Sequence, residues 1–153
     1  MPVFTVSVQP FGMTPATFTV SGQPIAQPRP RVVTIHGRSM SFVPKSHPIH
    51  AYRQAIALTG AAAGLKPHGG PVFVWMEFVV ARPKSHWRKN GLASDAPLLL
   101  TGKPDGDNLQ KGVLDALIGV AYTDDSQAVE WGGKKRYAER DESPHTRITV
   151  RAL

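Results

Sequence analysis

Residues 103–127 read KPDGDNLQKGVLDALIGVAYTDDSQ and predict a helix with aspartates at both of its ends. Pro104 ends any preceding helix, and Asp105 is a natural N-cap residue for the next one. Capping accounts for one aspartate there, but not for Asp107 two residues later or for the pair Asp124-Asp125 beyond the helix. The segment therefore predicts a helix surrounded by carboxylates that have some other purpose.

The geometry of this segment allows the acids to meet. The helix rises about 16 Å from Asp107 to Ile118, at roughly 1.5 Å per residue. The chain from Gly119 to Asp125 spans up to about 23 Å when extended. A short strand at residues 120–122, returning alongside the helix, therefore brings the second aspartate pair level with the first. Carboxylates this close repel unless a cation lies between them, and oxygen ligands without Cys or His favour Mg²⁺, with Mn²⁺ as a substitute.

Lys111 lies four residues after Asp107 and four before Asp115, so all three occupy one helical face. One interpretation is a solvated ladder of salt bridges, which contributes a few tenths of a kcal/mol per pair. The other places the Lys111 ammonium beside the metal, where it stabilises the charge of a transition state. The spacing alone does not separate these two interpretations.

The same helix carries apolar residues on two faces. One face is a core stripe of Leu109, Val113 and Leu117. Leu114 and Ile118 make the other face, which carries Lys111, apolar as well towards the helix C-terminus. That half of the helix therefore needs a second burial partner, which is either more of the domain or another subunit.

The charge balance favours a polyanionic partner. The 153 residues, enough for one domain, contain 18 Lys+Arg against 11 Asp+Glu, a net charge of +7. Six of the eleven acids lie between Asp105 and Glu130. A basic surface to hold a nucleic-acid backbone and a local group of acids to hold a metal are what a metal-dependent nuclease needs. On charge alone, a merely soluble basic protein is an almost equal alternative.

Several classes of protein are excluded. The absence of Cys rules out disulfides and thiolate metal sites. No apolar run approaches the length of a bilayer span, and the start MPVFTVSVQP lacks the basic head and cleavage site of a signal peptide. We therefore expect a cytoplasmic protein, with a loose arm at residues 1–14 and one domain at residues 15–153.

The first half of that domain alternates short strands with one helix. We predict a strand at residues 16–20, a hairpin from residues 32–35 and 40–43, and a helix from a Ser46 cap to about residue 63. His47 and His50 lie one turn apart, but two ligands without a third are more often surface residues than a metal site.

The second half begins with an apolar run. In residues 71–81 the side chains of both faces of a strand would be apolar, which predicts a central strand covered on both faces. Glu77 interrupts one of these faces, and we expect it at an edge or dimer contact. Further strands are expected at residues 128–137 and 147–152.

Residues 82–103 form a long loop that is rich in cations and contains Trp87. Such a loop is either nucleic-acid-facing or merely mobile. Its apolar run, Leu98-Leu99-Leu100, is either a short strand packed on the core, which we favour, or a wedge that holds bases apart at a DNA branch point.

These residues resemble the signature of the RusA family of Holliday junction resolvases. The matching runs are Lys103-Pro104-Asp105-x-Asp107-Asn108-Leu109-x-Lys111, Leu114-Asp115-Ala116-Leu117-x-Gly119 and Asp124-Asp125-Ser126-Gln127. Further landmarks are Ser21-Gly22, Arg29-Pro30-Arg31, Arg82-Pro83-Lys84-Ser85-His86-Trp87 and Lys134-Lys135-Arg136-Tyr137. The resemblance covers the chain from about residue 16 to the end.

The resemblance implies a homodimeric, Mg²⁺-dependent endonuclease that makes paired nicks across a four-way DNA junction. The implied fold is α/β of the two-layer α+β kind, a mixed β-sheet with two main helices. The family's essential acids match Asp105, Asp107 and Asp125, with Asp124 as a further metal ligand, and its essential lysine matches Lys111. Gly106 departs from the apolar residue usual there, which loosens the loop between two of these acids.

We also expect one group of side chains to contact DNA, and they are Arg29, Arg31, Lys84, Trp87, Arg88, Lys103, Lys134, Lys135 and Arg136. Two alternatives remain open from the sequence. One is a nuclease that acts mainly on flaps or forks, and the other is a branched-DNA-binding protein whose acids serve only as caps and salt bridges.

Overall fold

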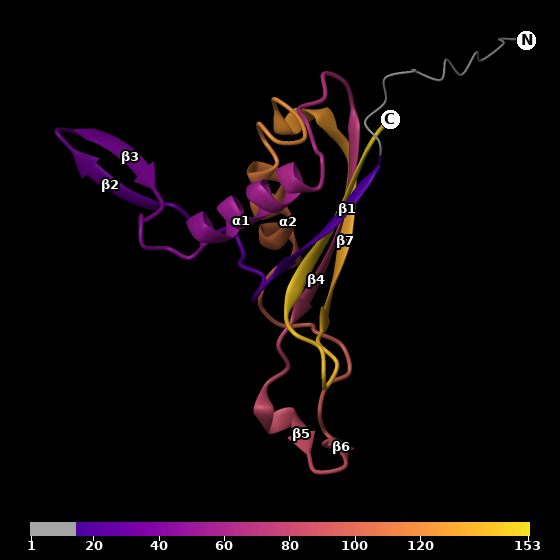
Figure 1. Ribbon diagram of the computed structural model, residues 1–153. Helices are drawn as coiled ribbons and strands as arrows, with labels where there is room; N and C mark the ends of the chain where they lie inside the picture. Colours follow the sequence, from indigo (N-terminus) through magenta and orange to yellow (C-terminus); the bar gives the residue numbers. More distant parts are fainter. Residues whose placement is uncertain (1–14) are drawn as a thin grey trace, which may run out of the picture.

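The computed structural model describes residues 15–153, so the arm predicted for residues 1–14 lies outside the described residues. Figure 1 shows the arrangement of the elements. They are β1 (Ala16–Ser21), β2 (Arg31–Ile35), β3 (Arg38–Phe42), α1 (Ile49–Ala62), β4 (Val72–Val80), the 3₁₀ turn η1 (Lys84–His86), β5 (Trp87–Arg88), β6 (Gly91–Leu92), α2 (Gly106–Ala116), the 3₁₀ turn η2 (Asp125–Gln127), β7 (Ala128–Tyr137) and β8 (His145–Ala152).

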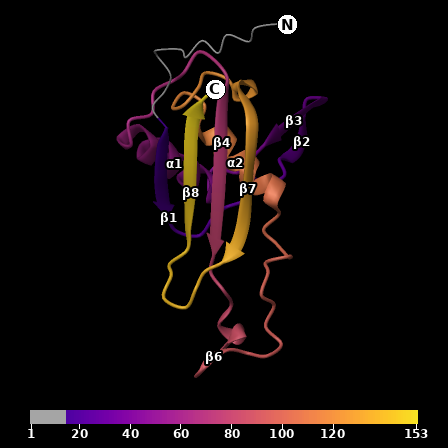
Figure 2. The ribbon, with the colours of Figure 1, turned by 90° about the vertical axis from the view of Figure 1, so that its right-hand side faces the viewer.

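Four strands form one mixed sheet in the order β1-β8-β4-β7. Strand β4 runs antiparallel to β8 and parallel to β7. The helices α1 and α2 pack on one face of this sheet, and Figure 2 looks onto its other face. The predicted two-layer α+β fold, a mixed sheet with two main helices, is therefore confirmed.

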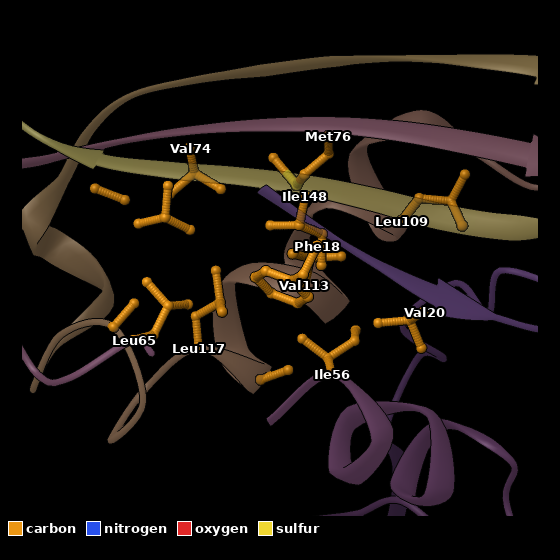
Figure 3. Close-up of a cluster of buried hydrophobic side chains, with 14 of the residues drawn as sticks. Phe18, Val20, Ile56, Leu65, Val74, Met76, Leu109, Val113, Leu117 and Ile148 are labelled. Carbon is orange, nitrogen blue, oxygen red and sulfur yellow. The ribbon is translucent and has the colours of Figure 1, made fainter. Parts of the chain in front are cut away.

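The core lies between this sheet and the two helices (Figure 3). Met76 of β4 and Ile148 of β8 are fully buried in one cluster with Ile56 of α1 and Val113 of α2. The predicted stripe of α2 is confirmed, because all three of its members have no exposed surface. The second apolar face of the helix remains half open, since Ile118 is 44% exposed.

The prediction for β4 is right in the position of the strand and only partly right about its coverage on both faces. The strand is central, but its side chains divide between two environments. Val74 and Met76 face the helices and are fully buried, whereas Trp75 is 42% exposed on the other face. On that other face Phe73 is half-buried and Val79 fully buried, so this chain covers the face only in part.

Two local predictions near the helices are wrong. Helix α1 begins at Ile49 after Pro48, and no side chain caps it, so Ser46 is not the cap. Instead, the Ile49 N–H donates to His47 Nδ1 at 3.1 Å. The expected return strand at residues 120–122 is a turn, because Gly119 takes a positive φ of 81° and donates to the Tyr122 carbonyl. The Tyr122 hydroxyl then anchors the turn by donating to the Leu114 carbonyl at 2.6 Å.

The loop at residues 82–103 is organised around arginine and aromatic side chains. The guanidinium of Arg82 lies 4.2 Å from the Tyr137 ring centroid and donates to the Pro97 carbonyl at 2.6 Å. Arg140 lies over Trp87, at 5.4 Å from the ring centroid. These contacts hold the small β5–β6 hairpin beyond the end of the sheet (Figure 2).

The three leucines of this loop differ in environment. Leu98 and Leu99 are each 76% exposed, whereas Leu100 is 7% exposed, and none belongs to a strand. The favoured prediction of a core strand is therefore wrong for the first two leucines and right in burial for the third. The wedge at a branch point remains a prediction for Leu98 and Leu99.

We expect Leu100→Ala to lower the free energy of unfolding by about 2 to 5 kcal/mol, because a buried leucine leaves a cavity. Leu99→Ser is the matched control, and it should leave the thermal midpoint unchanged because the side chain is exposed. Thermal unfolding of both variants tests this difference. Equal destabilisation by the two changes would contradict the burial described here.

No helix within residues 15–153 is long and apolar enough to cross a membrane.

Candidate active site

Three of the predicted site residues line one open pocket between α2 and the start of β7. They are Asp107 and Lys111 of α2, and Asp125 at the start of η2. Helix α2 presents the first two because they lie four residues apart on one face. The turn anchored by Tyr122 brings Asp125 back to the same helix. Asp107 and Asp125, from the two ends of the segment, therefore line the same pocket, and their meeting at one metal ion stays a prediction.

Asp105 lies at the N-cap of α2, as predicted, but its carboxylate makes no cap hydrogen bond. It lines a neighbouring hollow that also contains Arg29, His47 and Lys103. Among the described residues, Asp107 accepts only the N–H of the next residue, at 2.9 Å. Neither carboxylate forms an ion pair with another residue in the described part of the chain. Both are therefore free for a ligand.

Asp124 has a structural role that separates it from Asp125. Its carboxylate accepts the Ser126 N–H at 2.8 Å and caps η2. This hydrogen bond holds the pKa of Asp124 below its usual value. Gln127 completes a capping box, and its amide donates to the His68 carbonyl at 2.6 Å. The sequence analysis missed Gln127, although an acid followed three residues later by Gln is the signal of a capping box.

The acids do not form a complete metal site in the described geometry. Among residues 15–153, no three Asp, Glu or His side chains lie close enough together to share one metal ion. The ligand set Asp105, Asp107, Asp124 and Asp125 therefore stays a prediction. The donors nonetheless fit Mg²⁺ chemically, because this ion prefers carboxylate oxygens. Asp107 and Asp125 line one pocket, and Asp105 lies two residues before Asp107 at the N-cap of α2.

The part of the chain that matches a known protein family includes this pocket and most of the sheet. The family model described as endodeoxyribonuclease RusA matches residues 21–151. The chain belongs to the RusA family. A relative, the uncharacterized protein YqaN of Bacillus subtilis (strain 168), is 35% identical over 142 residues, which are 89% of this chain and 95% of that protein.

In this RusA-family chain, Lys111 forms one of the two predicted salt bridges and also lines the pocket, whereas its role beside a metal stays a prediction. Its ammonium lies 3.0 Å from Asp115, and its side chain is 59% exposed where it lines the pocket. Arg53 of α1 binds the same Asp115 carboxylate at 3.1 Å. Half of the predicted ladder therefore exists, and no ion pair joins Lys111 to Asp107 within residues 15–153.

Burial, together with the charges of Asp125 and Asp115, raises the pKa of the neighbouring Tyr122.

Lys135 supports the site from the adjoining strand of the RusA-family fold. Its side chain faces the helix layer from β7 and donates to the carbonyls of Gly102 and Pro104, at 2.5 and 2.9 Å. These two carbonyls belong to the turn that leads directly into Asp105. Lys135 was predicted to contact DNA, and in this structure it holds the backbone on which a site acid is carried.

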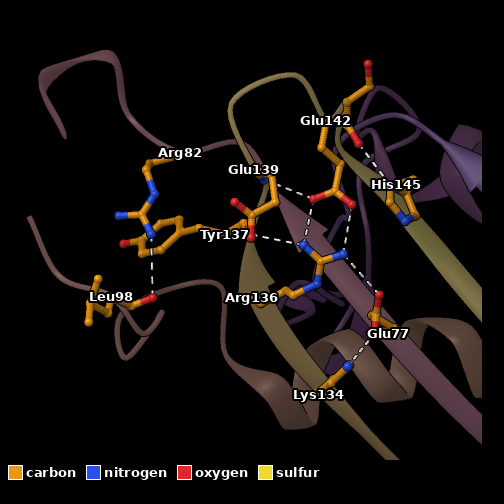
Figure 4. A network of polar contacts seen from close by, with 10 residues as sticks. Glu77, Arg82, Leu98, Lys134, Arg136, Tyr137, Glu139, Glu142 and His145 are labelled. Carbon is orange, nitrogen blue, oxygen red and sulfur yellow. Dashed lines mark hydrogen bonds and ion pairs between the residues drawn. The ribbon is translucent and has the colours of Figure 1, made fainter. Parts of the chain in front are cut away.

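The two neighbours of Lys135 point to the opposite face of the sheet (Figure 4). Lys134 pairs with Glu77 at 2.7 Å, and Arg136 binds Glu142 through both of its terminal guanidinium nitrogens. Arg136 and the Glu139 N–H lower the pKa of Glu142 to about 2. Glu77 therefore belongs to an ion-pair network on the central strand, and the structure does not place it at a sheet edge as one of the two predictions did.

The remaining predicted DNA contacts are distributed around the site. Arg29 and Lys103 share the hollow of Asp105, whereas Arg31 lies on the β2–β3 hairpin. Lys84 is exposed in η1. Arg88 donates to the Ser85 and Trp87 carbonyls, and Trp87 lies against Arg82 and Arg140. Arg88 and Trp87 thus organise the loop, whatever else they contact.

Proposed function

We propose that this RusA-family endodeoxyribonuclease resolves four-way DNA junctions by paired, symmetric, Mg²⁺-dependent nicks, in recombination and repair in the cytoplasm. The observation that carries the proposal is the convergence of Asp107, Lys111 and Asp125 on one pocket. These are positions that the resemblance assigns to the essential acids and lysine. The net charge of +7 supports a DNA partner.

The metal would be held by Asp105, Asp107 and Asp125, with Mn²⁺ as a substitute. When bound, Mg²⁺ lowers the pKa of a water molecule and offsets the charge of the phosphate. Asp105 and Asp107 have no ion pair to give up within residues 15–153. Asp124 accepts the Ser126 N–H with one carboxylate oxygen, so its other oxygen is the one available to the metal.

The chain's own residues position and stabilise the reacting phosphate. Lys111 extends into the pocket from α2 and offsets negative charge that grows on the non-bridging phosphate oxygens. Asp115, held by Arg53, orients the ammonium. Lys135 fixes the turn before Asp105. We assign the attack to water, since Ser126 makes no side-chain hydrogen bond to a base within the described residues.

A dimer is expected, because paired nicking of a two-fold junction requires two active sites. The pocket beside α2 has an apolar wall in which Val129 is 52% exposed and Trp131 55% exposed. We expect a second subunit to cover this wall together with Leu114 and Ile118, as the burial partner predicted for the helix. Light scattering should therefore give twice the chain mass of 16.6 kDa at micromolar concentration. A constant mass of 16.6 kDa over a wide concentration range would count against the dimer.

A panel of substrates tests the proposed specificity. Four-way junctions, flaps, forks and linear duplex are compared at one fixed salt concentration, because salt alone shifts DNA affinity strongly. The proposal predicts faster cleavage of the four-way junction than of any other substrate. Faster cleavage of flaps or forks would assign the same chemistry to a different substrate. Binding without cleavage of any substrate in Mg²⁺ would leave a DNA-binding protein.

A further inference from the structure

The β2–β3 hairpin has no partner within the described chain. It projects away from the helices (Figure 1), and all ten of its strand residues are exposed. An isolated two-stranded hairpin is at best marginally stable in water. A hairpin that exposes both faces therefore gains stability when something covers it.

The two faces of this hairpin differ sharply. Directly paired residues of an antiparallel ribbon point to the same face, and alternate pairs point to opposite faces. One face carries Val32 and Thr34 with Ser41 and Ser39. The other carries, in paired order, Arg31 with Phe42, Val33 with Met40 and Ile35 with Arg38. The hairpin is therefore amphipathic, with four exposed apolar side chains between an arginine at its base and another at its tip.

The charges select the kind of molecule that covers this apolar face. Residues 1–76 contain no Asp or Glu, so the hairpin has no acid near it in the sequence. Arg31 and Arg38 form no ion pair in the part of the chain that the structure describes. Two copies joined by this face would bring four arginines together without a counter-charge, whereas DNA supplies phosphates on both sides of a groove.

The base of the hairpin adjoins the candidate active site. Arg29, two residues before β2, lines the hollow that contains Lys103 and Asp105. A DNA strand whose phosphate lies near Asp105 therefore passes the base of the hairpin. The hairpin extends from there away from the helices (Figure 1).

We propose that the β2–β3 hairpin lies in the major groove of a duplex arm beside the cleaved phosphate, with its apolar face against the bases. The inference rests on the proposed function and adds a binding element to it. The major groove of B-DNA admits a two-stranded ribbon. Arg31 and Arg38 bind phosphates at the two ends of the contact. Val33, Ile35, Met40 and Phe42 contact base edges and thymine methyl groups, and this face carries no amide or carboxylate to read a sequence.

Binding measured without Mg²⁺ tests this inference independently of cleavage. The double variant Met40→Ser/Phe42→Ser should bind duplex and junction DNA about tenfold more weakly. Its salt dependence should stay unchanged, because no cation is removed. The double variant Arg31→Gln/Arg38→Gln should instead reduce the slope of log affinity against log salt by about two. Leu58→Ser is the matched control, since Leu58 is a 64% exposed leucine on α1. It should bind like the wild type.

Three outcomes would overturn the inference. In the first, both double variants bind like the wild type while wild-type cleavage of junctions is normal, which leaves the proposed function intact. In the second, the serine variant loses its dimer mass and keeps its DNA affinity, which assigns the face to a contact between copies. In the third, the wild type binds no DNA, and then the proposed function fails as well. Circular dichroism and thermal midpoints identify any variant that has not folded.

Discussion

Asp107→Asn should reduce junction cleavage by more than about a hundredfold while leaving junction binding intact or stronger. The carboxylate forms no ion pair within residues 15–153 and lines the same pocket as Asp125, where it repels a phosphate unless a cation lies between them. Even residues that only support metal ligands typically contribute 10- to 100-fold to metal affinity or activity, so a ligand itself contributes more. Single-turnover cleavage in Mg²⁺ and binding in its absence measure the two effects separately.

Asp141→Asn is the matched control for this change. It removes the same charge from an exposed residue in the turn between β7 and β8, outside the pocket. We expect wild-type cleavage from this variant and wild-type thermal midpoints from both. Full cleavage by Asp107→Asn would contradict its assignment to the metal site.

Lys111→Ala should reduce turnover by about 10²- to 10³-fold and change junction affinity far less. The structure places the ammonium at the pocket, where it acts on charge that develops only in the transition state. If Lys111 served only as the partner of Asp115, its loss would remove one exposed i,i+4 pair, which contributes a few tenths of a kcal/mol to stability. Saturating single-turnover rates, compared with dissociation constants, separate the two roles.

Two further variants define the role of Lys111. Lys66→Ala removes an exposed lysine outside the pocket and should cleave normally. Asp115→Asn breaks the salt bridge but keeps the ammonium, so it should retain most of the turnover that Lys111→Ala loses. Normal turnover by Lys111→Ala would establish the salt-bridge role instead.

The sequence predicted those features of the fold that follow from periodic patterns. The stripe of Leu109, Val113 and Leu117 is buried because a helix repeats every 3.6 residues, whatever surrounds it. The central place of β4 followed from its apolar character. Which face the helices cover depends on the packing of distant segments, so the same pattern wrongly predicted that Trp75 would be covered.

The candidate site was predictable in its residues and less so in its supports. The rise of the helix and the length of the chain after it predicted that Asp107 and Asp125 would lie near each other, and both line one pocket. The chain returns to the helix through a turn at Gly119 and not through the expected strand. Asp124 and Asp125 are adjacent in sequence, and the capping-box spacing of Asp124 and Gln127 was the one local signal that the first is a cap, as the hydrogen bond from Ser126 shows it to be. The support that Lys135 gives to Gly102 and Pro104 required the register of β7 against β4, which no local pattern contains.

The most direct test of this account is nick mapping on a synthetic four-way junction whose strands are labelled one at a time. The wild-type protein is incubated with the junction in Mg²⁺, and in a parallel reaction with a chelator. The account predicts two nicks at symmetric positions on opposing strands in Mg²⁺, and an intact but bound junction with the chelator. A junction that the folded protein binds but leaves intact at every Mg²⁺ concentration would contradict it.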